Sequence, residues 1–224
     1  MAILIWDRDE DRTIETGVDK GVIYPKNTEG QYGTGVAWNG LTAVNESPSG
    51  AEATAVYADN IKYMNLYSAE DYAYTIEAVN YPDEFLPCDG VRMVAPGVFL
   101  PQQSRRAFGF SYQTHIANED AGIDYGYKIH LCYNSKVTPT EKSHSTVNES
   151  PENETFSWEA NTTPEVVSII DPETGNAYKP VAHIEIDVTQ LTAAKKADLE
   201  RILYGGENSA PKLPLPDEVI QLLS

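Results

Sequence analysis

Residues 36–85 decide the fold and read VAWNGLTAVNESPSGAEATAVYADNIKYMNLYSAEDYAYTIEAVNYPDEF. The opening residues predict a strand, whereas residues 45–60 are rich in Ser, Gly, Ala and Asn and contain the turn cluster Ser47-Pro48-Ser49-Gly50. Returning strands follow and end at the Tyr81-Pro82 turn. Because residues 45–60 offer little that could fill a core, we expect them to form a long projecting loop.

Apolar and polar residues alternate in five later segments, which is typical of half-buried strands. These segments are residues 72–79, 105–116, 125–134, 156–161 and 182–188. Together with the opening stretch they predict a mainly β protein, an antiparallel β-sandwich or small barrel. The opposite faces carry small and polar side chains, which suit either solvent or a water-filled lumen.

One α-helix is expected to flank the strands. Thr192 is a suitable N-cap, residues 193–204 contain strong helix formers, and Gly205-Gly206 supplies a stop. The sandwich with this helix then spans residues 36–204. Residues 1–40 predict an N-terminal arm with the first strands, and residues 205–224 a C-terminal tail that caps this subunit or contacts the next one.

The charge excludes a conventional nucleic-acid-binding protein. The chain has 16 basic and 34 acidic residues, for a formal net charge of −18. A DNA-binding surface, in contrast, neutralises phosphates with a basic patch. No apolar run approaches the ~20 residues that span a bilayer, so we expect no membrane insertion. The opening MAILIWDRDEDR lacks the cationic start of a signal peptide, which predicts folding in the cytosol.

Sites for catalysis or cofactors are not expected. Gly33-Thr34-Gly35 lacks the third glycine of a dinucleotide fingerprint. His130 and Cys132 share a strand face, but zinc needs three or four ligands, and two are more often satisfied surface residues. The acidic pair Glu70-Asp71 is typical of solvated charges at a strand end. We therefore expect no enzyme activity, no cofactor and no metal.

Several motifs in order along nearly the whole chain carry a resemblance to a known family. They are WNGLTAVNESPSGAEATAVYADNIKYMNL, QQSRRAFGFSYQT, DYGYKIHLCYN and ERILYGG followed by PKLPLPDEVIQLL. In these motifs the chain resembles the major tail protein, or tail tube protein, of long-tailed siphovirus-type phages and prophages of Gram-positive bacteria. The resemblance implies a β-sandwich of the tail tube type and a structural virion protein.

The resemblance also implies partners and a location. Subunits of that family form hexameric rings that stack into a hollow tube, through which double-stranded DNA passes without specific binding. A tape-measure protein, a baseplate or distal tail protein and a tail terminator are the implied partners. Assembly in the cytoplasm of the bacterial host and residence in the virion tail follow from the same resemblance.

Three sets of residues are candidates for such an assembly. The ring-stacking candidates are Asn45, Glu46, Ser47, Pro48, Ser49, Gly50, Tyr57, Asp59 and Asn60. The lumen-facing candidates are Glu70, Asp71, Thr75 and Glu77. The subunit-interface candidates are Trp6, Arg105, Arg106, Leu213, Leu215, Val219 and Ile220, although an intramolecular ion pair is an equal alternative for the arginines.

Fourteen tyrosines and three tryptophans support an alternative function. Exposed aromatic rings stack on sugars, so a glycan-binding β-sandwich module of the adhesin or receptor-binding type is the second hypothesis. Most tyrosines fall on the apolar strand faces, where core or subunit packing is the simpler use.

Overall fold

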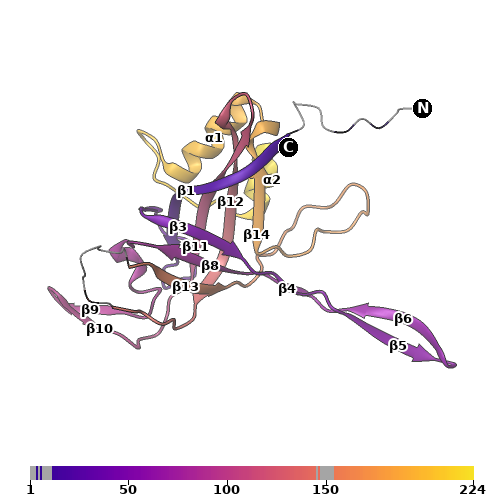
Figure 1. Ribbon diagram of the computed structural model, residues 1–224, viewed down its shortest axis with the longest axis horizontal. Coiled ribbons are helices and arrows are strands. Elements are labelled where there is room, and N and C mark those ends of the chain that lie inside the picture. Colours follow the sequence, from indigo (N-terminus) through magenta and orange to yellow (C-terminus); the bar gives the residue numbers. More distant parts are fainter. Residues whose placement is uncertain (1–3, 5, 7–11, 145, 147–153) are drawn as a thin grey trace.

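The computed structural model describes residues 4, 6, 12–144, 146 and 154–224, and it shows a mainly β protein (Figure 1). The strands of the main sheet are β1 (Thr13–Pro25), β2 (Val36–Trp38), β3 (Leu41–Glu46), β8 (Ala73–Ala78), β11 (Phe108–Asn118), β12 (Gly122–Val137), β13 (Phe156–Asn161) and β14 (His183–Asp187). The smaller strands are β4 (Ser49–Gly50), β5 (Ala53–Ala58), β6 (Ile61–Tyr67), β7 (Glu70–Asp71), β9 (Arg92–Ala95) and β10 (Val98–Leu100). The prediction of an antiparallel, mainly β fold is confirmed.

The main sheet has eight strands in the order β2-β1-β11-β12-β13-β8-β3, with β14 paired to β12. The long strand β12 joins its two parts, because residues 128–132 pair with β14 while Lys136 and Val137 pair with β13. The strands β13, β8 and β3 run across the β1-β11-β12 layer in Figure 1. The described strands do not close into a barrel.

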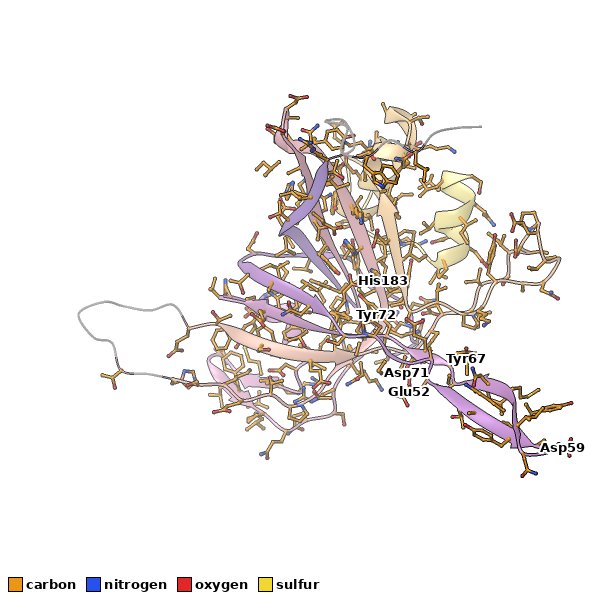
Figure 2. The ribbon with its side chains drawn as sticks, turned by 45° about the vertical axis from the view of Figure 1, so that its right-hand side comes forward. Glu52, Asp59, Tyr67, Asp71, Tyr72 and His183 are labelled. Carbon is orange, nitrogen blue, oxygen red and sulfur yellow. The ribbon has the colours of Figure 1, made fainter. Side chains whose placement is uncertain are left out.

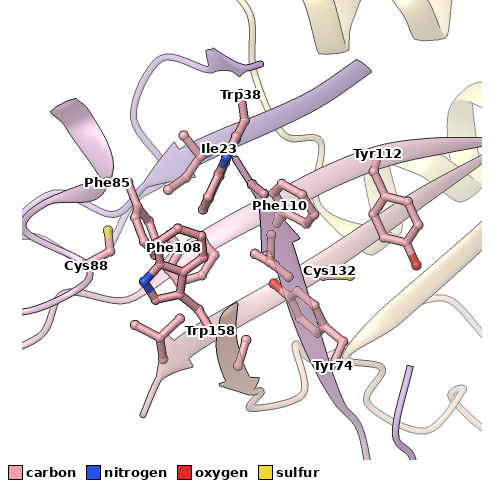
Figure 3. Close-up of a cluster of buried hydrophobic side chains, with 14 residues drawn as sticks. Ile23, Trp38, Tyr74, Phe85, Cys88, Phe108, Phe110, Tyr112, Cys132 and Trp158 are labelled. Carbon is pink, nitrogen blue, oxygen red and sulfur yellow. The ribbon is translucent and has the colours of Figure 1, made fainter. Parts of the chain in front are cut away.

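An aromatic core fills the space between these two parts of the sheet (Figure 3). Trp38 from β2, Phe110 from β11 and Trp158 from β13 meet edge to face, with Trp38 5.7 Å from Phe110 and 5.5 Å from Trp158 between ring centroids. Phe85, from the 3-10 helix η2 (Asp83–Phe85), packs against both tryptophans. Cys88 and Cys132 are buried free thiols of this core.

A second core lies on the other face of the sheet, beneath two helices. Leu199 and Leu203 of α1 (Ala193–Tyr204) and Val219 of α2 (Pro216–Leu223) pack against Ile129 and Leu131 of β12. The predicted helix and its cap are confirmed, since the Thr192 side chain accepts a hydrogen bond from the Lys195 N–H. A second helix, α2, corrects the expectation of a single one. A 3-10 turn, η3 (Val188–Gln190), precedes α1.

Because both faces of β11 and β12 are covered, the prediction of a polar, wetted face is wrong for these strands. Ser111 and Gln113 are buried opposite the aromatic core; Gln113 Nε2 donates to the Tyr204 hydroxyl at 2.8 Å. His130 and Cys132 are buried as well, which corrects their expected place on the surface.

The N-terminal segment needs a similar correction. Residues 1–3, 5 and 7–11 of the expected arm lie outside the described residues, but β1 is an inner strand of the sheet, paired with both β2 and β11. Val22, Ile23 and Tyr24 are buried in the two cores. Much of residues 1–40 therefore belongs to the body. Neither helix in the described part of the chain has the length and apolarity to cross a bilayer.

Candidate functional site: a projecting hairpin and its root

A β-hairpin extends from the body between β3 and β8. Its outer part pairs β5 with β6, and its stalk pairs β4 with β7 through Ser49–Asp71 and Gly50–Glu70. Figure 1 shows β4 leaving the body and the outer β5–β6 part reaching well away from the main sheet. The expected projection is present, but it is a hairpin that continues to Asp71 rather than a loop ending at Asn60.

The turn at the tip explains why the chain reverses there. Asp59 and Asn60 connect the two strands, and both have left-handed backbones with φ of 51° and 62°. A two-residue turn with two positive φ angles matches the twist of antiparallel strands, and Asp and Asn tolerate this conformation better than most residues. Figure 2 shows Asp59 at the far end of the projection.

The hairpin exposes apolar side chains on both faces. Cross-strand partners share a face, so the pairs Val56–Met64 and Thr54–Leu66 lie opposite the pair Ala53–Tyr67. The large apolar side chains that are 46% to 71% exposed are Tyr57, Ile61, Tyr63, Met64, Leu66 and Tyr67. An isolated two-stranded hairpin is marginally stable in water, and apolar side chains gathered on such an element are typical of an interaction surface.

The structure divides the ring-stacking candidates between the body and the hairpin. Asn45 and Glu46 are the last residues of β3 and belong to the main sheet. Ser47 and Pro48 lead into the stalk, which holds Ser49 and Gly50 in β4. Tyr57, Asp59 and Asn60 lie on the outer hairpin, and all three are exposed.

A polar cluster sits at the root of the hairpin, where β3 leaves the sheet. His130 Nδ1 from β12 lies 3.2 Å from His183 Nε2 of β14 and 3.4 Å from Glu46 Oε1. His183 Nε2 is 3.9 Å from the same carboxylate oxygen. The Tyr112 hydroxyl donates to Glu46 Oε1 at 2.7 Å.

Aromatic rings hold both imidazoles in place. Tyr112 stacks on His130 and Tyr72 stacks on His183, each with 4.5 Å between ring centroids. Figure 2 shows Tyr72 and His183 close to the point where the hairpin joins the body. Burial lowers the pKa of both histidines, more than Glu46 raises it, which favours neutral imidazoles. Burial also raises the pKa of the Tyr72 and Tyr112 hydroxyls.

This cluster of Glu46, His130 and His183 was missed by sequence reasoning. Within the described part of the chain, these are the His, Cys, Asp or Glu groups placed closely enough to share a metal ion. The three residues are far apart in the sequence, and no ligand spacing links them. The pairing of β12 with β14 brings the two histidines together. It sets His130 opposite Glu185 and Cys132 opposite His183, so His130 and His183 are diagonal neighbours on the same face of the sheet.

The lumen-facing candidates fall into two places. Thr75 and Glu77 alternate with the buried residues of β8 and lie on its outer face, where Glu77 Oε1 accepts a hydrogen bond from Asn45 Nδ2 at 3.2 Å. Glu70 and Asp71 instead form β7, on the stalk, and both are exposed. The four candidates therefore do not form one continuous acidic face.

The C-terminal interface candidates also divide. Leu213 and Val219 are buried in the second core of this chain, so for these two the interface prediction is wrong and the capping alternative holds. Leu215 is exposed and Ile220 is half-buried. Both remain accessible to a neighbour.

The remaining interface candidates lie near the N-terminus and before β11. Trp6 is exposed. Arg105 and Arg106 precede β11, which begins at Phe108. The expectation that they lie on a strand is therefore wrong. Arg105 forms an ion pair with Asp89 at 3.3 Å, which is the intramolecular alternative. Arg106 is half-buried.

A second exposed hairpin, β9–β10, was not predicted. Among the described strands, its two strands pair only with each other, and its exposed apolar residues are Met93, Val94, Val98, Phe99 and Leu100. The sequence feature that indicates this hairpin is the segment RMVAPGVFL, in which a Pro-Gly turn separates two short apolar runs. It adds a second apolar surface to the molecule.

Comparison with protein-family models gave no match, and comparison with curated proteins gave none either.

Proposed function

We propose that this chain is a self-assembling structural subunit, the major tail tube protein of a long-tailed phage or prophage. The projecting β5–β6 hairpin is the observation that carries this proposal. It exposes apolar side chains on both faces, and burying them against neighbouring subunits removes that surface from water. The sequence motifs supply the family, and with it the hexameric rings, the hollow tube and the passage of DNA.

The described surfaces support assembly in two further ways. The strands β2 and β3 end the main sheet, and sheet ends of this kind pair readily with strands of another chain. A repeated contact between different faces of identical subunits closes into a ring or continues as a filament. In this proposal the tape-measure, distal tail and terminator proteins set where the tube begins, how long it grows and where it stops.

The outer face of β8 is our candidate for the lumen. Thr75 and Glu77 project from it, and the net charge of −18 gives phosphates no general attraction to the protein. A tube wall of this kind lets DNA slide without binding. The proposed location is the virion tail, after assembly in the host cytoplasm.

Negative-stain electron microscopy and sedimentation velocity over a concentration series test the proposal. We expect rings or hollow tubes of uniform width from the wild-type chain. Leu66→Asp on β6 should leave folded monomers, because a charge replaces an apolar contact. Val166→Asp is the control: Val166 is also strongly exposed but lies outside the hairpin. Assembly by Leu66→Asp as efficient as that of the wild type would contradict the role of the hairpin.

A glycan-binding module is the second candidate. Most tyrosines are buried or half-buried, as expected. Tyr57, Tyr63 and Tyr67 are nevertheless exposed on the hairpin, and such rings stack on sugars. Glycan-array binding by a protein that stays monomeric at every concentration would favour this function over the tube subunit.

A further inference from the structure

We propose that Glu46, His130 and His183 form a binding site for a divalent transition-metal ion of the Zn²⁺ class at the root of the projecting hairpin. Two imidazoles and one carboxylate are a ligand set that zinc commonly takes, with an open position for water. The proposal concerns the monomer and does not depend on the proposed function.

The separations of the three ligand atoms fit such an ion. The edges of the triangle they form are 3.2, 3.4 and 3.9 Å. A point equidistant from atoms with these separations lies about 2.1 Å from each, and zinc bonds to imidazole nitrogen and carboxylate oxygen are about 2.0–2.2 Å long.

Hydrogen bonding around His130 selects the tautomer that a metal requires. Thr114 Oγ1 has a single hydrogen, which it donates to Glu15 Oε1 at 2.6 Å. Thr114 Oγ1 must then accept from His130 Nε2, which is 3.0 Å away. The proton of His130 therefore sits on Nε2, and the lone pair of Nδ1 points into the cluster. Support of this kind behind a ligating histidine is typical of metal sites.

Without a cation, two ligand atoms of the cluster face each other with no hydrogen between them. A proton on His183 Nε2 could serve the lone pair of His130 Nδ1, but it then leaves Glu46 Oε1 facing that nitrogen at 3.4 Å without a hydrogen between them. The Tyr112 hydroxyl donates to this carboxylate from outside the triangle. A cation satisfies all three ligand atoms at once. Burial, which favours neutral imidazoles, keeps their lone pairs available.

The place of the site in the fold defines what a bound ion would do. Glu46 ends β3, immediately before the chain enters the stalk, whereas His130 and His183 belong to the paired strands β12 and β14. An ion shared by these residues would tie the end of β3, from which the hairpin leaves, to β12 and β14. We expect it to reduce the motion of the hairpin relative to the body.

Co²⁺ titration of the untagged, chelator-treated protein tests the proposal, with visible absorption as the readout and Zn²⁺ as the competitor. We expect one equivalent of Co²⁺ to bind with the absorption of a four- or five-coordinate site, and Zn²⁺ to displace it. Zn²⁺ should raise the melting temperature and slow hydrogen exchange in residues 45–48.

Four variants separate this site from adventitious binding. Glu46→Gln and His183→Gln should lose Co²⁺ binding, and Thr114→Val should weaken it roughly tenfold by removing the support of His130. His144→Gln is the matched control, because His144 also lies beside a carboxylate, Glu154, but on the surface. Circular dichroism of each metal-free variant checks that it is folded.

Absence of stoichiometric Co²⁺ or Zn²⁺ binding to the wild-type chain would overturn the proposal and leave the cluster a structural hydrogen-bond network. Equal loss of binding in the folded His144→Gln variant would overturn it as well, since the ion would then sit on the surface. Because all three ligands belong to one chain, failure to bind metal leaves the assembly proposal untouched, and failure to assemble leaves the metal proposal untouched.

Discussion

At the scale of single residues, Gly109 allows the sheet and the C-terminal segment to approach each other. A Cβ atom added at Gly109 would lie 2.2 Å from Leu213 Cδ2 and 3.0 Å from the Tyr32 ring. Leu213 is fully buried, so its side chain has little room to move. We expect Gly109→Ala to lower the free energy of unfolding by about 1–3 kcal/mol through overpacking, as measured by urea denaturation.

The double variant Gly109→Ala/Leu213→Ala provides the control for this explanation. Removing the clashing side chain should make the two effects less than additive, because the cavity left by Leu213 accepts the new methyl group. Strictly additive losses would show that Gly109 matters for another reason.

Asp89 is a second residue whose replacement should lower the free energy of unfolding. Its buried carboxylate pairs with Lys142 at 2.7 Å and with Arg105 at 3.3 Å. Asp89→Ala leaves two partly buried cations without their partner, so we expect a loss of about 1–3 kcal/mol in the free energy of unfolding. Asp120→Ala, at an exposed turn, should change it by less than about 0.5 kcal/mol. Similar effects of the two substitutions would contradict this ranking.

At the scale of elements, α2 depends on Glu218 to begin. Glu218 accepts hydrogen bonds from the Leu215 N–H at 2.9 Å and from Lys212 Nζ at 2.7 Å. Partial burial raises the pKa of this carboxyl, but the two bonds outweigh it and the net pKa lies below the usual 4.5. A lowered folded-state pKa stabilises the fold above the unfolded-state pKa, and this contribution is lost as the pH falls through the folded-state value.

Glu218→Gln should therefore reduce the free energy of unfolding at neutral pH, by at most about 1 kcal/mol because the site is largely exposed. The difference from wild type should shrink as the pH falls below 4.5. Urea denaturation at several pH values measures this, with Glu207→Gln as the exposed control. A difference that grows on acidification would contradict the assignment.

The elements that local chemistry specifies were predictable from the sequence. The cap at Thr192, the helix formers after it and the glycine stop predict α1 with its observed bounds. The composition of the hairpin predicts a loop because Ser, Gly and Ala dominate its first half, although the Asp59-Asn60 turn between apolar runs indicates a hairpin. The covered polar faces of β11 and β12 could not be predicted, because alternation does not say what packs against each face.

The candidate site, too, could be predicted from the sequence only in part, because sequence patterns do not show which distant segments pack together. The projection of residues near 45–60 follows from their composition, so this half of the site was predictable. The root was not, because Glu46, His130 and His183 come from three strands whose pairing only the folded sheet defines. For the same reason the apolar residues Leu213 and Val219 suggest an interface from sequence, although the second core of the chain buries them.

At the scale of the whole molecule, the charge of −18 opposes contact between identical subunits. Salt screens this repulsion, with a Debye length of about 8 Å at 0.15 M and 30 Å at 0.01 M. We expect rings or tubes to form at lower protein concentration as NaCl is raised, while the Leu66→Asp monomer stays monomeric. Sedimentation velocity at several salt concentrations measures this. Assembly that weakens with salt would instead indicate that ion pairs between subunits dominate.

The two buried cysteines have a practical consequence. Burial raises the pKa of the Cys88 thiol to about 12 and raises that of Cys132 further, so neither forms the reactive thiolate at neutral pH. The chain contains no other cysteine. A cysteine introduced at Asp59 would then be the single thiol open to maleimide dyes. The native cysteines therefore need not be removed before the hairpin tip is labelled. Fluorescence from the labelled tip can then follow its distance to a neighbouring subunit.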